Sequence, residues 1–311
     1  MHSLYSVLSH PQYHNPDSSL YTPILSMVMT KEHYHESITV FPNAKAYCKD
    51  LVQWIQTLVS QRDMRPVSIL HISEYPSHVD PTSFVVLISG EPDAIPHQVG
   101  VTICPFLHQP QPSLYYPFLY MSLSERTLYD LARQPKTKTC AFMYNQNYAH
   151  RNDWFHRIHA HLPVDAMGKA CNNTGAESTR HVHNEHETYN DIAVRTYASY
   201  QFVLAIENTW KDGYFTEKIL NPILAHSIPL YWGHPHVFEY INKNRVLYLP
   251  DFESDDAIVA RLHHLQTHPV EYESILNEPC YTPRGDPERV AREFKLALAQ
   301  VLDKSTNTDK S

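Results

Sequence analysis

The sequence predicts an α/β protein made of two Rossmann-like domains that face each other across a cleft. The chain has 311 residues, of which 42% are apolar, and this length is typical of about two domains of ~150 residues. Short runs rich in β-branched residues alternate with segments whose apolar residues recur at helical spacing. Strands that alternate with helices form right-handed βαβ units and a mainly parallel sheet.

The first half of the chain contains one predicted helix and three predicted strands. Residues 1–40 show no periodicity, so we expect an irregular lead-in. The helix is expected over Ala44–Arg62, where apolar residues form one stripe at helical spacing. The three strands are short apolar runs bounded by Pro, Ser or Gly, as in a sheet covered on both faces: Val67–Ile72, Phe84–Ile88 and Val99–Ile103.

A second α/β series begins near Lys138, after the breaker cluster Gln109–Pro112. Its predicted strands are Thr139–Tyr144, Gln201–Ile206, Ile228–Trp232 and Val246–Leu249. Its predicted helices are Arg151–His161, Glu185–Tyr197, Thr216–His226, Asp255–His268 and Pro287–Leu302, and Asp165–Gly175 is predicted to be a loop. We therefore predict an N-terminal domain over residues 1–135, a C-terminal domain over residues 136–303 and a polar tail over residues 304–311. The cleft between two such domains is the expected ligand site.

The charge composition limits the ligands that the chain can bind. With 33 acidic and 25 basic residues, the formal net charge is −8. A general binder of nucleic acid or anionic membrane needs clustered Lys and Arg, so neither class is expected. A ligand that carries phosphate would have to be held by a few cations at defined positions.

The cysteines and histidines do not predict a metal site or a disulfide framework. The five cysteines are widely spaced and include no CxxC pair. The 22 histidines include two close groups but neither an HExxH pattern nor zinc spacing, so we expect them to be solvated or capping: His181, His183 and His186, and His263, His264 and His268. No window approaches the ~18 apolar residues of a transmembrane helix, and Met1–Thr30 lacks the features of a signal peptide. We predict a soluble, cytoplasmic protein.

The segment Phe202–Gly233 has the pattern strand, polar loop, helix, buried strand. The free amides and the dipole at a helix N-terminus favour an anion. Lys218 adds a positive charge there, and Glu217 could accept hydrogen bonds from sugar hydroxyls. The alternative is a helix capped by Thr216 with ordinary first-turn charges on a solvated face.

This segment resembles the donor-binding signature of the alpha-1,3-fucosyltransferases, particularly the soluble bacterial type. The family pattern is an aromatic residue, Glu-Asn-Ser/Thr, a spacer, Tyr-x-Thr-Glu-Lys, and a strand with Pro and Gly. The residues in register are Glu207, Asn208, Thr209, Tyr214, Thr216, Glu217, Lys218, Pro229 and Gly233. The resemblance extends over roughly residues 85–280. Three features depart from the pattern: Ile206 in place of an aromatic residue, Ala166-Met167 in the glycine-rich loop, and Pro222 inside the expected helix. Pro222 is expected to kink that helix.

The resemblance implies the two-domain arrangement called GT-B and an inverting, single-displacement transfer from GDP-fucose, held mainly by the C-terminal domain. Arg151 and Lys218 would meet the pyrophosphate, whose negative charge grows as the glycosidic bond breaks. The other predicted donor-site residues are Lys169 in the glycine-rich loop, Glu207, Asn208 as a support of its loop, and Tyr214 and Glu217 toward sugar hydroxyls. For Arg151 the alternative is an arginine on a helix surface. No cofactor is expected, and a divalent metal ion would at most stimulate.

A direct displacement also needs a base that takes the proton of the acceptor hydroxyl. Glu91 follows the predicted strand Phe84–Ile88 and so lies at the carboxyl end of the N-terminal sheet. The resemblance places the family's proposed base in this element, and the alternative is a loop glutamate in a turn. We expect Glu91 to be the base.

The function expected from the resemblance is transfer of L-fucose to a hydroxyl of a glycan that contains N-acetylglucosamine, with an alpha-1,3 linkage. The expected partners are GDP-fucose and the glycan acceptor. Two alternatives remain open: a GT-B transferase that uses another GDP-sugar, and a glycan- or nucleotide-binding protein without activity.

Overall fold

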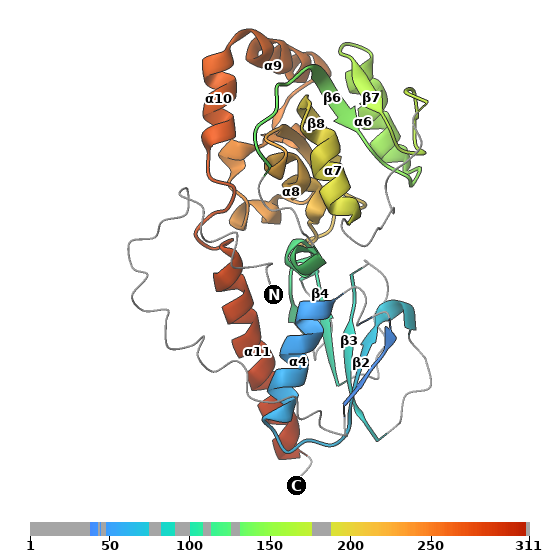
Figure 1. Ribbon diagram of the computed structural model, residues 1–311, viewed down its shortest axis with the longest axis vertical. Helices are drawn as coiled ribbons and strands as arrows, with labels where there is room; N and C mark the ends of the chain where they lie inside the picture. The colour runs from blue at the N-terminus through green and yellow to red at the C-terminus, as the bar shows by residue number, and fades with distance from the viewer. Residues whose placement is uncertain are drawn as a thin grey trace.

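The computed structural model describes residues 38–42, 44, 48–74, 82–90, 100–107, 113–125, 131–175 and 188–308. These residues form two five-stranded sheets in which all paired strands run parallel. The two sheets occupy opposite ends of the long axis of the molecule, each with its own helices (Figure 1). The predicted α/β class with two Rossmann-like domains is confirmed.

The N-terminal sheet has the strand order β1-β2-β3-β4-β5. Its strands are β1 (Ile38–Val40), β2 (Val67–His71), β3 (Phe84–Ile88), β4 (Val101–Cys104) and β5 (Ser113–Tyr115). The helical elements of this half are α4 (Lys49–Ser60), α5 (Phe118–Met121) and the 3₁₀ turns η3 (Ile72–Glu74) and η4 (Ser122–Glu125). The predicted helix and three predicted strands are present. The strands β1 and β5 were missed, because each has three residues and is only partly buried.

The C-terminal sheet has the strand order β10-β9-β8-β6-β7. Its strands are β6 (Lys138–Phe142), β7 (Val164–Ala166), β8 (Tyr200–Ile206), β9 (Ile228–Trp232) and β10 (Leu247–Tyr248). Its helical elements are α6 (Ala149–His159), α7 (Tyr189–Tyr197), α8 (Glu217–Leu224), α9 (Asp255–Thr267), α10 (Pro269–Asn277), η5 (Pro235–Glu239), η6 (Lys243–Arg245) and η7 (Leu249–Asp251). After β6 the chain adds β7 on one side and β8 on the other. Ligands of open parallel sheets bind beyond the carboxyl ends of the strands at such a switch point.

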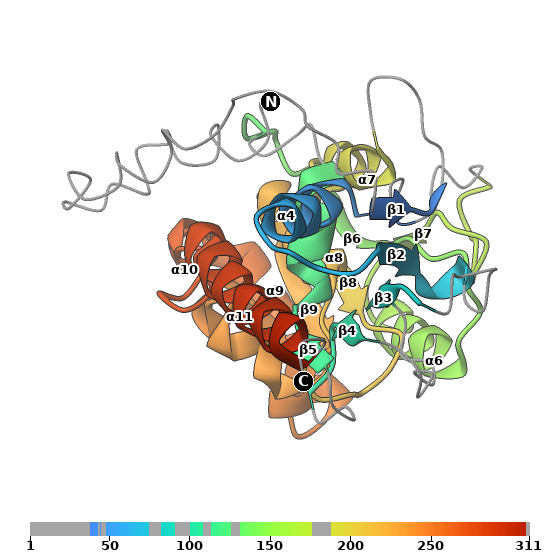
Figure 2. The ribbon, with the colours of Figure 1, turned by 90° about the horizontal axis from the view of Figure 1, so that it is seen from below.

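The last helix, α11 (Pro287–Thr308), lies against the N-terminal half of the molecule. It contacts α4 and β5, and α4 and α11 run side by side (Figure 2). The ring of Phe294 packs at 4.4 Å from that of Tyr116. The segment expected to be a polar tail from residue 304 is helical through Thr308, because no Gly or Pro interrupts it. The division into domains at residues 135 and 303 stays a prediction.

Within the described ranges, no helix is both long and apolar enough to cross a membrane. The five cysteines are free thiols, and four of them are buried. The predicted cytoplasmic location stays a prediction.

Candidate functional site

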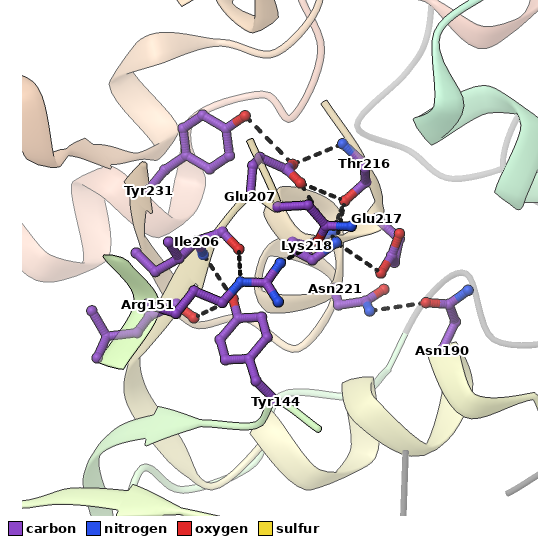
Figure 3. Close-up of polar contacts among 12 residues, drawn as sticks. Tyr144, Arg151, Asn190, Ile206, Glu207, Thr216, Glu217, Lys218, Asn221 and Tyr231 are labelled. Carbon is purple, nitrogen blue, oxygen red and sulfur yellow. Dashed lines mark hydrogen bonds and ion pairs between the residues drawn. The ribbon is translucent and has the colours of Figure 1, made fainter. Parts of the chain in front are cut away.

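The carboxylate of Glu207 lies just beyond the end of β8 and is completely buried. Its Oε1 accepts a hydrogen bond from the backbone N–H of Thr216 at 2.8 Å, and its Oε2 accepts one from the Thr216 hydroxyl at 2.9 Å. The Tyr231 hydroxyl lies 3.5 Å from Oε1, and Lys218 Nζ lies 3.5 Å from Oε2 (Figure 3). Burial raises the pKa of Glu207, and the Lys218 ammonium opposes this rise. The Glu207 side chain therefore connects the N-terminus of α8 to the end of β8 through hydrogen bonds.

The first turn of α8 carries charges that are buried. Thr216 caps the helix by accepting a hydrogen bond from the backbone N–H of Lys218. Lys218 Nζ donates to Thr216 Oγ1 at 3.0 Å and lies 3.7 Å from Glu217 Oε1. Glu217 and Lys218 are 3% and 9% exposed. The alternative of a capped helix is right about Thr216, but it is wrong about the solvated face.

Arg151 reaches the same strand end from α6. Its Nε donates to the carbonyl oxygen of Ile206 at 3.2 Å, and Nη2 donates to Oδ1 of Asn208. The guanidinium carbon lies 4.4 Å and 4.8 Å from the ring centroids of Tyr144 and Tyr148. Arg151 is only 2% exposed, so the alternative of an arginine on a helix surface is wrong.

The structure therefore brings the two predicted cations to one place. Arg151 holds the residues on both sides of Glu207 through Ile206 and Asn208, and Lys218 is paired with the Glu207 carboxylate. Figure 3 shows the two side chains pointing toward the same region beyond β8. Two preorganised cations in a buried setting interact more strongly with an anion than they would in water.

Lys169 lies in the glycine-containing loop after β7, and its side chain is exposed. Its backbone N–H donates to Oδ1 of Asn145 at 3.2 Å. A Cβ added to the preceding Gly168 would lie 1.9 Å from the carbonyl oxygen of Tyr144. The backbone of this loop therefore lies directly against the backbone of Tyr144, whose ring contacts the Arg151 guanidinium. The predicted contact of Lys169 with the donor stays a prediction.

Tyr214 is buried in the seam between the two halves. Its ring stacks on that of Phe106, with the centroids 6.0 Å apart. The neighbouring backbone is held by the N-terminal half, since Leu107 N–H donates to the Asp212 carbonyl at 3.2 Å and the Tyr115 hydroxyl donates to the Gly213 carbonyl at 2.9 Å. The predicted orientation of a sugar hydroxyl by Tyr214 stays a prediction.

Glu91 lies outside the described residues. The strand before it, β3, is present, and Ser89 N–H continues the pairing with the carbonyl of Ile103 at 2.9 Å. The role of Glu91 as a base therefore stays a prediction.

Two tyrosines that support the site were not predicted from the sequence. The Tyr144 hydroxyl donates to the Leu204 carbonyl at 3.0 Å and accepts from Ile206 N–H at 2.7 Å. Tyr231 is fully buried beside Glu207. Both residues lie in or next to predicted strands, where a buried tyrosine needs a hydrogen-bond partner. That requirement is the one signal that could have indicated them.

These features define a class of protein: two parallel α/β domains, with two buried cations beyond the carboxyl edge of the second sheet. Residues 133–277 match the family model described as Glycosyltransferase family 10 (fucosyltransferase) C-term. A candidate fucosyltransferase of Acanthamoeba polyphaga mimivirus is 36% identical over 96% of this chain and 52% of its own length. An alpha-(1,3)-fucosyltransferase of Helicobacter pylori is 31% identical over 43% of this chain and 26% of its own.

A crystal structure of an alpha-1,3-fucosyltransferase with GDP-fucose has a TM-score of 0.59 and 19% identity, over 88% of this chain and 95% of that one. The predicted resemblance is therefore confirmed. Residues 133–277 are similar to the C-terminal domain of the family 10 fucosyltransferases, and the fold is GT-B. The similarity to the mimivirus relative extends beyond residues 85–280. The present chain spans about half the length of that relative and about a quarter of the H. pylori one.

Proposed function

We propose that this protein is an inverting glycosyltransferase that transfers L-fucose from GDP-fucose to a hydroxyl of a glycan containing N-acetylglucosamine, in an alpha-1,3 linkage. The observation that carries the proposal is the placement of Arg151 and Lys218 on either side of Glu207 at the end of β8. Both cations lie within the residues that match the fucosyltransferase model.

The chemistry follows from the charge that develops during the reaction. As the bond between fucose C1 and the diphosphate oxygen breaks, negative charge grows on the departing GDP. A guanidinium can bind such oxygens through two N–H groups, and an ammonium acts as a point charge. Because hydrogen bonds to Ile206, Asn208 and Thr216 hold both cations in place, little reorganisation is needed when the charge appears.

The acceptor hydroxyl would attack C1 from the face opposite to the departing GDP, which inverts the anomeric centre. Its proton would pass to Glu91, which follows the carboxyl end of β3. We expect no metal requirement, because the two protein cations can stabilise the charge that a metal ion would otherwise neutralise. Within the described part of the chain, no group of three or more His, Cys, Asp or Glu side chains is arranged to hold a metal ion.

The proposal is tested by the variant Glu91→Gln, with transfer from labelled GDP-fucose to a glycan array as the assay. We expect GDP affinity to stay near normal while turnover falls by roughly 100-fold or more, as for loss of a general base. Unchanged turnover would eliminate Glu91 as the base.

The wild-type protein also separates the alternatives. Faster transfer from GDP-mannose or GDP-arabinose than from GDP-fucose would change the assigned donor. Tight GDP binding with neither transfer nor donor hydrolysis would show a binding protein.

A further inference from the structure

Two large aromatic side chains are exposed beside the candidate donor site. Tyr148, at the start of α6, is 40% exposed, and Trp210, in the loop after β8, is 45% exposed. Exposed aromatic rings that border a polar site are suited to contact a ligand.

The two exposed rings belong to a continuous row of rings. The centroids of Tyr148 and His150 are 5.8 Å apart, those of His150 and Trp232 4.8 Å, and those of Trp232 and Trp210 5.3 Å. His234 extends the row at 5.9 Å from Trp210. We call Tyr148, His150, Trp210, Trp232 and His234 the aromatic platform.

The platform is attached to the residues that hold the two cations. The ring of Tyr148 lies against the Arg151 guanidinium, and His150 Nε2 lies 3.0 Å from the backbone carbonyl oxygen of Glu207, to which it can donate. Trp210 follows Asn208 by two residues. At the other end, His234 Nδ1 lies 3.3 Å from Asp212 Oδ1, on the loop that contacts the N-terminal half. The platform therefore extends from the donor site toward the seam between the two sheets.

We propose that the aromatic platform binds a pyranose ring of the acceptor glycan, so that the C-terminal half contributes to acceptor recognition. This inference rests on the proposed function. The C–H face of a pyranose packs on an aromatic ring, while His234 and Asp212 offer polar atoms to its hydroxyls. An acceptor hydroxyl must reach C1 of the donor sugar, and a subsite that borders the cations satisfies that condition.

The shape of the platform fits a sugar chain better than a nucleotide base. Successive rings are inclined to one another by 31°, 37°, 58° and 73° from Tyr148 to His234. The rings therefore form a stepped surface and not the pair of parallel faces that would sandwich a planar purine. Successive pyranose rings of a glycan are themselves tilted relative to one another.

The test compares Trp210→Ala and Trp210→Phe with the wild-type protein. Leu296→Ala is the matched control, because Leu296 is an exposed apolar residue (60%) on α11, which packs on the N-terminal half. We expect Trp210→Ala to raise KM for the acceptor about 10-fold, with kcat and KM for GDP-fucose changed less than about two-fold. Trp210→Phe should keep most of the affinity, and Leu296→Ala should behave as wild type.

Direct binding to an array of glycans that end in galactose or N-acetylglucosamine gives a second readout. Loss of the bound glycans in Trp210→Ala supports the proposal, whereas an unchanged profile, or no binding by the wild type, overturns it. An increase confined to KM for GDP-fucose, or to the Kd of GDP, would show that the Trp210 ring stacks on the guanine of the nucleotide. That result would also overturn the proposal. If the wild type transfers no fucose, the proposed function fails, and the array comparison still decides whether the platform binds sugar.

Discussion

Replacement of Lys218 by methionine tests whether the buried carboxylate of Glu207 depends on this ammonium. The two groups are 3.5 Å apart, with side-chain exposures of 7% and 0%. At that distance and an effective dielectric constant of about 20, their attraction is roughly 5 kcal/mol. Removing one partner of a buried pair typically costs about 3–5 kcal/mol. Glu207 keeps both hydrogen bonds from Thr216. We therefore expect the free energy of unfolding of Lys218→Met to fall by about 3 kcal/mol, the lower end of this range.

The loss of stability should depend on pH in a defined direction. Burial already raises the pKa of Glu207 above 4.5, and Lys218 opposes that rise. Without Lys218 the pKa of the folded state rises further, so the folded variant binds a proton at a pH where the unfolded chain has released it. The stability of Lys218→Met relative to wild type is then highest at low pH and falls as the pH rises through the folded pKa of Glu207.

The assay is urea unfolding of wild type, Lys218→Met, Glu207→Gln and the double variant at pH 5 and pH 8. The double variant should recover more than half of the loss at pH 8, because the neutral amide needs no counter-charge. Lys243→Met is the control, since Lys243 forms a half-exposed pair with Asp251 at 2.7 Å and should cost less than about 1 kcal/mol. A loss in Lys218→Met that is independent of pH and unchanged by Glu207→Gln would refute the reasoning.

Three further outcomes are expected. Arg151→Lys cannot keep both the Ile206 and the Asn208 contacts, so fucose transfer should fall about 100-fold; a change only in KM for the glycan would contradict this role. Gly168→Ala places a Cβ 1.9 Å from the Tyr144 carbonyl oxygen, so the free energy of unfolding measured in urea should fall by about 1–3 kcal/mol. An unfolding midpoint equal to that of the wild type would mean that the loop can move away from Tyr144 at no cost. Initial rates of transfer should survive EDTA within about two-fold, and activity that is abolished by EDTA and restored by Mg²⁺ or Mn²⁺ would disprove the metal-independent mechanism.

The elements that could be predicted from the sequence are those with a strong local pattern. The strands β3 and β9 have the predicted bounds because each is a run of apolar residues between turn formers. The elements that were missed have no such pattern. The strand β7 has three residues, two of which lie inside the predicted loop Asp165–Gly175. The helix α10 begins at Pro269, one residue after α9 ends at Thr267. The packing of α11 on α4 depends on contacts between residues about 240 positions apart, such as Lys295 Nζ at 4.1 Å from the ring centroid of Trp54, which no local pattern encodes.

The candidate site shows the same limit at the level of single side chains. The resemblance to the alpha-1,3-fucosyltransferases implied that Arg151, Glu207 and Lys218 share one site, and the structure places them together. Spacing along the chain does not report the direction of a side chain. It could not show that Glu207 is directed toward Thr216 and Tyr231, or that Tyr214 packs on Phe106 of the other half.

The two cations are held by the two ends of one loop. Asn208, at its start, bonds Arg151, and Thr216, at its end, bonds both Lys218 and Glu207. The middle of this loop is bonded to Leu107 and Tyr115 of the N-terminal half. A shift of the N-terminal sheet relative to the loop would therefore move the supports of both cations together. The positions of the two cations thus depend on residues outside the C-terminal half, and for this reason the C-terminal motif alone does not define the candidate site.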